Sequence, residues 1–387
     1  MGMKTHNIVV LGAGYAGVMA ANQLADNHNV TLINARPQFV ERIRLHQFVV
    51  GGHPAQVPLA EILNPDVRVI VAQAQRIDAG ERRIVLDNAP AVPYDYLVYA
   101  VGSRAELPTL PGSEFAYSLA DWESAQRLRA ALNCSPQTVT VVGGGLTGIE
   151  TAAELAEARP ELHVILVTAS VVAPGFSSRG RRAVLRALTT LGVSVYENSR
   201  VRRLEQTKVV TDRETVPSDV TIVTTGLRAG SLAAESGLTT DMLGRLVTDH
   251  ALRSSDPRII AAGDAAGPPA DVAHHIRMSC ASALPLGALA ARTVNELAAG
   301  NEPGPISAGF IIQCLSLGRR RGVVQHVAPD DQPRDLAISG RAGAFVKEQI
   351  CRGTLKWLAR EIQKPGSYKW PDGPRATAEI SREVHAG

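Results

Sequence analysis

The apolar positions near the start of this chain form a strand, a Gly-rich turn, a helix and a second strand. Residues 7–11 are apolar without alternation, which is typical of a strand buried on both faces. The turn from Gly12 to Gly17 follows, and an Ala-rich helix runs to about residue 25. A strand at 30–33 completes the unit.

The same order returns later in the chain. Strands are expected at 138–142 and 163–167, with a turn at 143–148 and a helix at 149–158 between them. Each unit has the pattern of a βαβ opening, in which parallel strands flank a helix. Two such openings predict an α/β fold with two Rossmann-like dinucleotide-binding domains, or a duplicated one.

Shorter apolar runs fill the rest of the chain. We expect further strands at 68–71, 83–86, 96–100, 193–196, 201–204, 208–211, 220–224 and 258–262, and a helix at 281–297. The Gly- and Pro-containing segment 300–305 has the composition of a boundary. Beyond it we expect a C-terminal α+β region with strands at 310–317, 322–326 and 336–339, a basic helix at 344–364 and an extended tail.

The two Gly-rich turns are the main candidate binding sites. In such a turn the first Gly makes the bend, the second lets a pyrophosphate approach the backbone, and the third lets helix and strand pack closely. The helix start then offers unpaired N–H groups and a positive dipole end. The residues that match are Gly12, Gly14 and Gly17 in the first turn and Gly143, Gly145 and Gly148 in the second.

The residue after the second strand of each unit departs from the usual pattern. An acidic residue commonly binds the ribose hydroxyls there, but this chain has Asn34 and Thr168. Asn34 can still bond a hydroxyl. At Thr168 the missing carboxylate removes a repulsion against a 2′-phosphate, so we expect NADPH to be used at least as well as NADH. Downstream arginines can reach such a phosphate or simply form a solvated helix start: Arg179, Arg181 and Arg182.

Composition limits the other possibilities. A chain of 387 residues suggests two or three domains, and its net charge of +3 does not imply nucleic-acid binding. The four cysteines are widely spaced, which argues against a disulfide framework and favours the cytoplasm. We identify no signal peptide, no membrane span and no metal-binding motif.

These motifs give the chain a family resemblance over roughly residues 5–365. It resembles the two-dinucleotide-binding-domain flavoproteins of the pyridine nucleotide-disulfide oxidoreductase superfamily, and within them the type II NADH dehydrogenases and related NADH:quinone oxidoreductases. The resemblance rests on LGAGYAG at 11–17, LVYAVGS at 97–103, VVGGGLTGIE at 141–150, VTTG at 223–226 and IIAAGDAAG at 259–267. It implies FAD in a discontinuous domain of residues 1–115 and 245–300, NADH or NADPH in a domain of residues 116–244, and a separate C-terminal region of residues 301–387.

The resemblance also assigns individual residues. Asp264 resembles the Asp that bonds the flavin ribityl chain, and Glu150 the Glu beside the nicotinamide and flavin. Independently of this match, Glu150 is expected in a first helical turn, where a carboxylate is favoured with or without a catalytic role. The other positions implied to bind the cofactors are Ala16, Ala35, Arg36, Ala74, Ala100, Val101, Gly102, Thr225, Gly226, Gly263, Cys280 and Ala281.

The chain departs from its relatives at two places. Residues 41–52 lack the redox Cys pair of the disulfide reductases, and SCASALPLG at 279–287 lacks the Gln of the usual quinone motif. Cys280 is then either a flavin contact or a buried inert thiol. Polar groups near the flavin ring can instead come from two segments, ERIRLHQ and HHIRM, with the candidates Arg42, Arg44, His46, His274, His275 and Arg277.

The helix expected at 344–364 is amphipathic. Trp357, Leu358 and Ile362 share an apolar face, and Lys356 and Arg360 lie on a basic one. Such a helix suits an anionic membrane surface, the chain's own core or the second subunit of a homodimer. The three remain open.

We therefore expect an FAD-dependent NAD(P)H oxidoreductase that passes a hydride to flavin and two electrons to a quinone-like acceptor. The alternative is a soluble tailoring oxidoreductase acting on a small aromatic or quinonoid metabolite, which the missing Gln motif favours. A non-catalytic nucleotide sensor is a third hypothesis. The two intact Gly turns and Asp264 argue against it.

Overall fold

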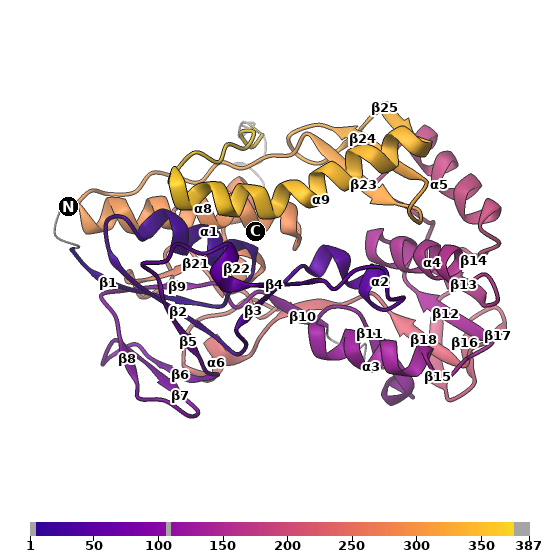
Figure 1. The fold of residues 1–387 in the computed structure, drawn as a ribbon, viewed down its shortest axis with the longest axis horizontal. Helices are drawn as coiled ribbons and strands as arrows, with labels where there is room; N and C mark the ends of the chain where they lie inside the picture. The colour runs from indigo at the N-terminus through magenta and orange to yellow at the C-terminus, as the bar shows by residue number, and fades with distance from the viewer. Residues whose placement is uncertain (1–4, 106–109, 375–387) are drawn as a thin grey trace, which may run out of the picture.

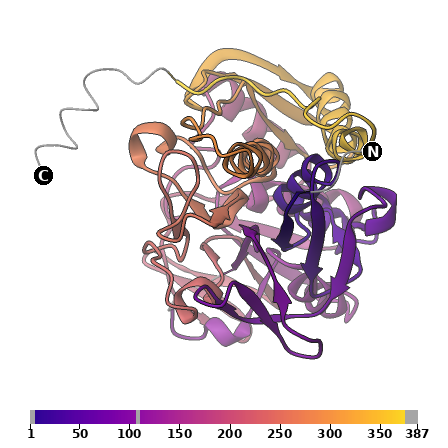
Figure 2. The same cartoon turned by 90° about the vertical axis from the view of Figure 1, so that its left-hand side faces the viewer.

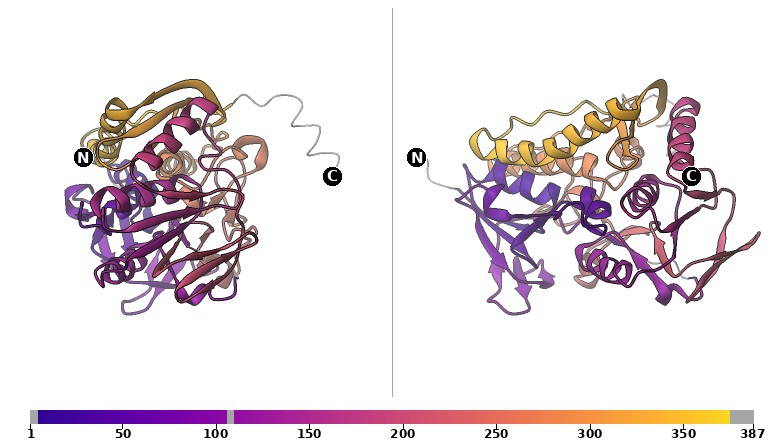
Figure 3. Two further views of the ribbon diagram at one scale, coloured as in Figure 1. Left: turned by 90° about the vertical axis from the view of Figure 1, so that its right-hand side faces the viewer. Right: turned by 45° about the vertical axis from the view of Figure 1, so that its right-hand side comes forward.

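The computed structural model describes residues 5–105 and 110–374. The chain forms two lobes, and one long helix crosses both (Figures 1 and 3). The α/β class with parallel sheets is confirmed. Within the described residues, no helix is long and apolar enough to cross a membrane.

The first lobe contains a five-stranded parallel sheet built from two distant parts of the chain. In spatial order its strands are β21 (Ile259–Ala261), β9 (Tyr96–Tyr99), β1 (Asn7–Leu11), β2 (Asn29–Asn34) and β5 (Arg68–Val71). The helices α1 (Tyr15–Leu24) and α8 (Cys280–Ala298) pack together on one face, and α8 is seen end-on in Figure 2.

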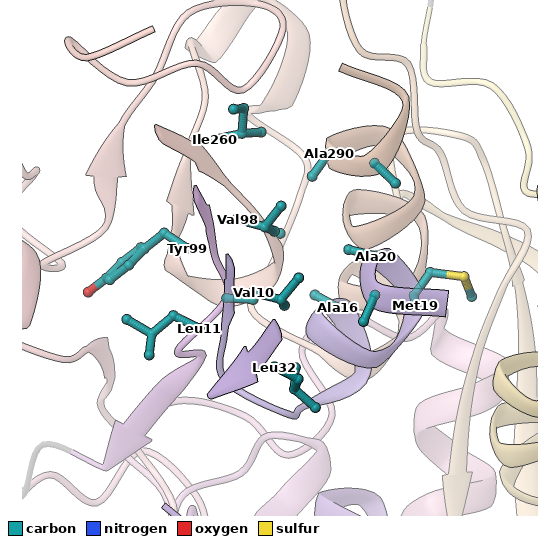
Figure 4. Packing of buried hydrophobic residues seen from close by; sticks show 14 of the residues in the cluster. Val10, Leu11, Ala16, Met19, Ala20, Leu32, Val98, Tyr99, Ile260 and Ala290 are labelled. Carbon is teal, nitrogen blue, oxygen red and sulfur yellow. The ribbon is translucent and has the colours of Figure 1, made fainter. Parts of the chain in front are cut away.

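Side chains from both faces of this sheet are buried. Val10, Val98 and Ile260 point toward α1 and α8, whereas Leu11 and Tyr99 point to the opposite side (Figure 4). Each of the five is at most 4% exposed. This two-sided burial explains why the strands are apolar without alternation.

The second lobe repeats the arrangement. Its parallel sheet runs β11 (Ala116–Ser118), β18 (Val220–Val223), β12 (Thr138–Val142), β13 (His163–Val167) and β14 (Ser194–Tyr196). Three helices pack against it: α3 (Trp122–Leu132), α4 (Leu146–Ala158) and α5 (Ser178–Thr190). The antiparallel pair of β10 (Ser103–Ala105) and β19 (Leu227–Ala229) joins the lobes where the chain leaves one and returns to the other.

Small antiparallel and two-stranded elements complete the two lobes. They are β3 (Gln38–Val40) with β4 (Gln56–Pro58); β6 (Ala74–Asp78), β7 (Arg83–Leu86) and β8 (Val92–Pro93); β15 (Val201–Glu205), β16 (Lys208–Thr211) and β17 (Thr215–Pro217); and β20 (Leu246–Val247) with β22 (Ala266–Gly267). Short helical segments are η1 (Arg42–Arg44), α2 (Leu45–Phe48), η2 (Leu59–Glu61), η3 (Ser113–Phe115), α6 (Leu232–Glu235), η4 (Gly263–Ala265) and α7 (Ala270–Ala273).

The sequence analysis missed α3 and α5 and began α4 three residues too late. Both missed helices carry an N-cap signal: Asp121 accepts from Ser124 N–H at 2.8 Å, and Ser177 from Gly180 N–H at 3.2 Å. Because α4 begins at Leu146, Glu150 lies beyond its first turn. The expected help from the helix dipole at Glu150 was therefore wrong.

The C-terminal region forms an antiparallel sheet of β23 (Ile312–Ser316), β24 (Gly322–Val327) and β25 (Pro333–Ser339), followed by the helix α9 (Gly340–Gln363). This helix packs on α1 in the first lobe and on β23 and β24 beside the second (Figure 1). Leu358 is fully buried against the chain's own core, so it is not available to a bilayer. For Leu358 the structure shows the core as the partner, whereas Trp357 on the same expected face is 37% exposed.

A buried carboxylate holds the segment that follows α9. Glu361 is 0% exposed and accepts hydrogen bonds from Gly366 N–H at 2.7 Å and Tyr368 N–H at 2.6 Å. The Ser367 hydroxyl and the Gln23 amide each donate to it at 2.7 Å. The expected extended tail is therefore pinned as far as it is described, and residues 375–387 lie outside the described residues.

Replacing Glu361 by Ala is expected to destabilise the C-terminal segment strongly. The Gly366 and Tyr368 N–H groups lose their buried acceptor, and a hydrogen bond to a charged group contributes about 1.5–3 kcal/mol. A lower thermal midpoint and faster proteolysis near residues 364–370 are the readouts. Gln363→Ala, on the exposed side of the same helix, is the matched control. Equal stability of the two variants would contradict this role for Glu361.

Candidate functional site

The first Gly-rich turn is held tightly except at its middle residue. Gly12 has φ +104°, and a Cβ there would lie 2.4 Å from Ala100 O. A Cβ on Gly17 would lie 1.9 Å from Gly12 O. Around Gly14, in contrast, no atom lies within 4 Å of the corresponding position, and Gly14 begins α1 without a side-chain cap. Packing thus requires Gly12 and Gly17, while Gly14 leaves space beside the unpaired N–H groups of the helix.

A polar cluster around the Asp264 carboxylate lies where the strands β9 and β21 end. The Ser103 hydroxyl donates to Asp264 Oδ2 at 2.6 Å, and Arg42 Nη1 lies 3.5 Å from the same oxygen. Asp264 Oδ1 is buried, and no hydrogen-bond partner reaches it among the described residues. An orphan carboxylate oxygen of this kind can accept a hydrogen bond from a ligand hydroxyl.

The backbone around this cluster depends on close approach. Gly102 follows Ala100 and Val101 with φ +71°. Gly263 has φ +65°, and a Cβ on it would lie 2.8 Å from the Ala16 Cβ. The structure therefore brings these five predicted positions beside Gly12 and Asp264.

The second Gly-rich turn repeats the geometry of the first. Gly143 has φ +129°, and a Cβ on Gly148 would lie 1.9 Å from its carbonyl oxygen. Gly145 has no atom within 4 Å of its would-be Cβ, and it begins α4 without a side-chain cap. The exposed pair Thr225 and Gly226 follows β18 at the same edge, where Thr224 packs against the turn.

Near Thr168, the position expected to face a ribose, lies an acid that the sequence analysis missed. Thr168 is buried against Gly144, whose Cβ would lie 2.7 Å from its hydroxyl. Glu197 follows the neighbouring strand β14 and accepts from Val172 N–H at 2.5 Å. Arg181 Nη2 lies 2.6 Å from both of its carboxylate oxygens. Burial alone would raise the pKa of Glu197, but these hydrogen bonds outweigh it and hold the pKa low.

The pairing of Arg181 changes the expectation for NADPH. Arg181 is committed to Glu197, whereas Arg179 and Arg182 are exposed on α5. One of the three arginines considered for a 2′-phosphate is therefore neutralised by a carboxylate. The missing carboxylate at position 168 therefore no longer favours NADPH by itself.

Glu150 is paired with a lysine from the other end of the chain. Lys347 Nζ, on α9, lies 3.1 Å from Glu150 Oε1, and the two side chains are 12% and 11% exposed. Ser316 donates to the same oxygen from its N–H at 2.9 Å and from its hydroxyl at 3.1 Å. His46 Nε2 lies 3.3 Å from the Ser316 hydroxyl. The four residues come from α4, α9, β23 and α2.

In this network Glu150 and Lys347 are charged, and the His46 imidazole is neutral. Burial would raise the pKa of Glu150, but Lys347 and the other partners outweigh it and lower it. Burial would lower the pKa of Lys347, yet its neighbours, which include Cys314 and Glu150, hold it well above the ordinary value. Burial lowers the pKa of His46 to about 4, so the imidazole is neutral near pH 7.

The cysteines do not form a thiol relay here. All four are free. Burial raises the pKa of Cys280 to about 12 and that of Cys351 to about 11, with Lys347 opposing both shifts. Both are thiols near pH 7, which agrees with the inert alternative. The charges of Lys347 and Asp264 act on the pKa of Cys280 in opposite directions.

Asn34 is used within the protein. Its Oδ1 accepts from Ala13 N–H at 3.1 Å, and its amide donates to Arg36 O at 2.7 Å. Ala35 lies between these two, and Ala74 begins β6 two residues after Ala72, whose N–H bonds Asn34 O. Arg36 itself pairs with Glu123 of the second lobe.

The remaining candidates are only partly brought together. His275 bonds Ala308 O at 2.7 Å, and Arg277 pairs with Asp331 and lies 4.6 Å from the Phe310 ring centre. Arg44 forms two hydrogen bonds to Glu348 at 3.1 and 3.0 Å. These groups connect the first lobe to the C-terminal region. Ala281 is exposed in the first turn of α8, and His274 is exposed as well.

Lys347 was the main omission. One signal was available. The residues four positions before Lys347 and four, seven and eleven positions after it are small or apolar: Gly343, Cys351, Thr354 and Leu358. Lys347 lies on that stripe, which the structure buries. A lysine on a buried stripe requires a partner. No comparable local signal marks Ser103, Ser316 or Glu197, because each meets its partner through tertiary contacts.

Comparison with known proteins shows what this chain is similar to. The sequence model of the pyridine nucleotide-disulphide oxidoreductase family matches residues 6–283. The NADH dehydrogenase-like protein Rv1812c of Mycobacterium tuberculosis is 30% identical over 328 residues, covering 75% of this chain and 80% of that one.

Two solved structures show the same fold. NDH2 of Plasmodium falciparum in complex with NADH superimposes with a TM-score of 0.77 at 15% identity, covering 95% of this chain and 99% of that one. The sulfide:quinone oxidoreductase of Aquifex aeolicus gives a TM-score of 0.77 at 18% identity and covers 92% of both chains.

The two open Gly positions provide a reciprocal test. Gly14→Val is expected to yield folded protein without flavin, because the side chain fills the space beside the α1 N–H groups. Gly145→Val is expected to retain flavin and to weaken nicotinamide-nucleotide binding at least about tenfold. Flavin absorbance per chain and calorimetric titration with NAD⁺ are the measurements.

Each of these variants is the control for the other. Gly17→Ala is expected to disturb the fold itself, because the added Cβ would overlap Gly12 O. Flavin retained at full occupancy in folded Gly14→Val protein would overturn the assignment of the first turn.

Proposed function

The chain belongs to the pyridine nucleotide-disulphide oxidoreductase family, and we propose that it transfers electrons from NAD(P)H through FAD to a quinone. It is an NAD(P)H-dependent flavin oxidoreductase. The acceptor and the residues that hold each cofactor are the proposal. The observation that carries it is the pair of open glycines, Gly14 and Gly145, each at the start of an uncapped helix.

The first turn is the proposed FAD site. Gly14 leaves room for the pyrophosphate at the positive end of α1. Asp264 Oδ1 is the free acceptor for a ribityl hydroxyl, and Ser103 and Arg42 hold the other oxygen of that carboxylate. Bound FAD would supply the hydride acceptor and the two-electron donor.

The second turn is the proposed NAD(P)H site, with Gly145 in the role of Gly14. Thr225 and Gly226 continue the same edge of the sheet. Glu150 lies on α4, which begins at this turn, and the charges of Lys347 and Asp264 both act on the Cys280 thiol. We therefore assign the pair to the space between the two nucleotides.

Lys347 is the residue that we assign to the acceptor. Its ammonium remains charged and donates one hydrogen bond to Glu150, which leaves further N–H groups. An ammonium in a buried site favours negative charge on a neighbouring oxygen and can supply a proton to it. Reduction of a quinone oxygen requires both.

Two observations favour a quinone over a disulfide. Cys280 and Cys351 have raised pKa values, so neither offers a thiolate near pH 7. Sulfide:quinone oxidoreductase, which shares the fold, has a quinone in its name. A specific aromatic or quinonoid metabolite is the second candidate acceptor, because residues 279–287 lack Gln.

Peripheral membrane contact is proposed at a different surface from the one expected. Leu336 and Ile338 on β25 are 62% and 47% exposed, and Phe345 on α9 is 66% exposed. Arg334 and Arg341, both exposed, lie in the same segment. Apolar side chains flanked by cations suit an interface with anionic lipid.

Lys347→Met is expected to slow reoxidation of reduced flavin by a quinone at least about tenfold, while reduction by NADH continues. It also leaves Glu150 buried without its counter-charge, which destabilises the protein. The double variant Glu150→Gln, Lys347→Met is expected to regain stability but not reoxidation. Stopped-flow absorbance separates the two half-reactions. Normal reoxidation in the double variant would contradict the role of Lys347.

The acceptor is tested by steady-state oxidation of NADH with soluble quinones, ferricyanide, oxygen and a disulfide. We expect quinones to exceed oxygen and disulfide at least about tenfold in kcat/KM. Quinone in anionic vesicles should be reduced too, and Leu336→Ser with Phe345→Ser should lose only the vesicle reaction. Turnover of ferricyanide alone would favour the specific-metabolite alternative.

A further inference from the structure

We infer that the Arg181–Glu197 pair makes this chain select NADH over NADPH. The inference rests on the proposed placement of the nicotinamide nucleotide at the second Gly turn. It concerns the far end of that site, where the adenosine ribose would lie after the pyrophosphate is bound.

The pair lies beside the loop that ends β13. β13 and β14 are parallel neighbours with Val167 opposite Tyr196, so Glu197 follows β14 at the level of Thr168. Asn198 N–H bonds Ser170 O at 3.0 Å, and Ala173 N–H bonds Gly144 O at 2.9 Å. The loop is thereby tied both to the strand that carries Glu197 and to the Gly turn.

Glu197 holds this loop at a further point. Val172 N–H donates to its Oε1 at 2.5 Å, while Arg181 Nε donates to Val172 O at 3.1 Å. Val172 therefore receives one partner from each member of the pair. The loop, the carboxylate and the guanidinium form one unit.

The carboxylate replaces the acid that is missing at position 168. A Rossmann-type site for NADH commonly carries an acid after the second strand, where it accepts from the ribose 2′-hydroxyl and repels a 2′-phosphate. Here Thr168 is buried against Gly144 and carries no charge. Glu197, 25% exposed, brings a carboxylate to the same edge from the adjacent strand.

The guanidinium is already committed to Glu197 and to the Val172 carbonyl. Arg181 contacts both oxygens of Glu197 at 2.6 Å, which satisfies the Nη2 donors and neutralises the charge. A phosphate that recruited Arg181 would leave Glu197 unpaired and add like charge beside it. Binding of NADPH therefore carries a penalty that NADH avoids.

Glu197→Gln is the decisive variant. The amide oxygen can still accept from Val172 N–H, so the loop is retained, but the negative charge is lost and Arg181 is released. Calorimetric dissociation constants of NAD⁺ and NADP⁺ are measured on the FAD-loaded protein, together with flavin reduction by NADH and NADPH. In the unaltered chain we expect at least about tenfold tighter binding of the NAD⁺ form.

In Glu197→Gln that ratio is expected to fall at least about tenfold, mainly through tighter NADP⁺ binding. Glu205→Gln is the matched control, since Glu205 is also partly exposed and bonded to an arginine, Arg203 at 2.9 Å, but lies on β15. It should leave both constants unchanged.

A merely structural pair predicts a different result. Glu197→Gln would then weaken both nucleotides equally and leave their ratio unchanged, which would overturn the inference. An unaltered chain that binds NADP⁺ as well as NAD⁺ would overturn it too, with Arg179 and Arg182 as the groups responsible. If neither nucleotide binds or reduces the flavin, the proposed placement of the nucleotide has failed.

Discussion

The buried ion pair of Glu150 and Lys347 is the interaction on which the arrangement of the molecule depends. The two groups lie 3.1 Å apart, and each side chain is close to nine-tenths buried. Removing one partner from such a pair costs about 3–5 kcal/mol, because the other charge is left in the interior. The native state is therefore favoured only when α9, near the end of the chain, lies against α4 in the second lobe.

Further charges extend this contact along α9. Glu348 bonds Arg44 of η1, and the turn before β24 carries Arg319, whose Nη2 lies 2.9 Å from Glu154 of α4. At the other end of the helix, Leu358 O accepts from Asn22 of α1 at 2.9 Å. The C-terminal helix thus contacts both lobes (Figure 3), and its Lys347 pairs with Glu150 of the second lobe. A helix with the amphipathic pattern of a membrane anchor is thus packed into the fold itself.

The two Gly turns share one local geometry. In each turn two glycines are required, because a Cβ at the last one would lie only 1.9 Å from a backbone oxygen. The middle glycine opens toward solvent. The difference lies at the ribose ends. Asn34 is occupied by backbone partners, whereas Glu197 enters from a neighbouring strand with its own arginine. The inferred discrimination between NADH and NADPH therefore rests on charges beyond the motif.

The sequence by itself determined the features that depend on neighbours along the chain. Strands such as 7–11, 138–142 and 163–167 agree with the structure to the residue, because unbroken apolar runs and Gly turns report local geometry and burial. The same local rules predicted the glycines of both turns, whereas Asp264 was proposed from the family resemblance.

Only the tertiary structure decided the partners of charged groups. Glu150 was expected as a helix-start carboxylate, but it lies in the second turn of α4 and pairs with Lys347, almost two hundred residues away in sequence. Thr168 suggested a site open to a 2′-phosphate until the fold brought Glu197 beside it. Charge acts through space at distances of a few ångströms, and the chain's own order does not encode which charges the packed strands and helices will bring that close.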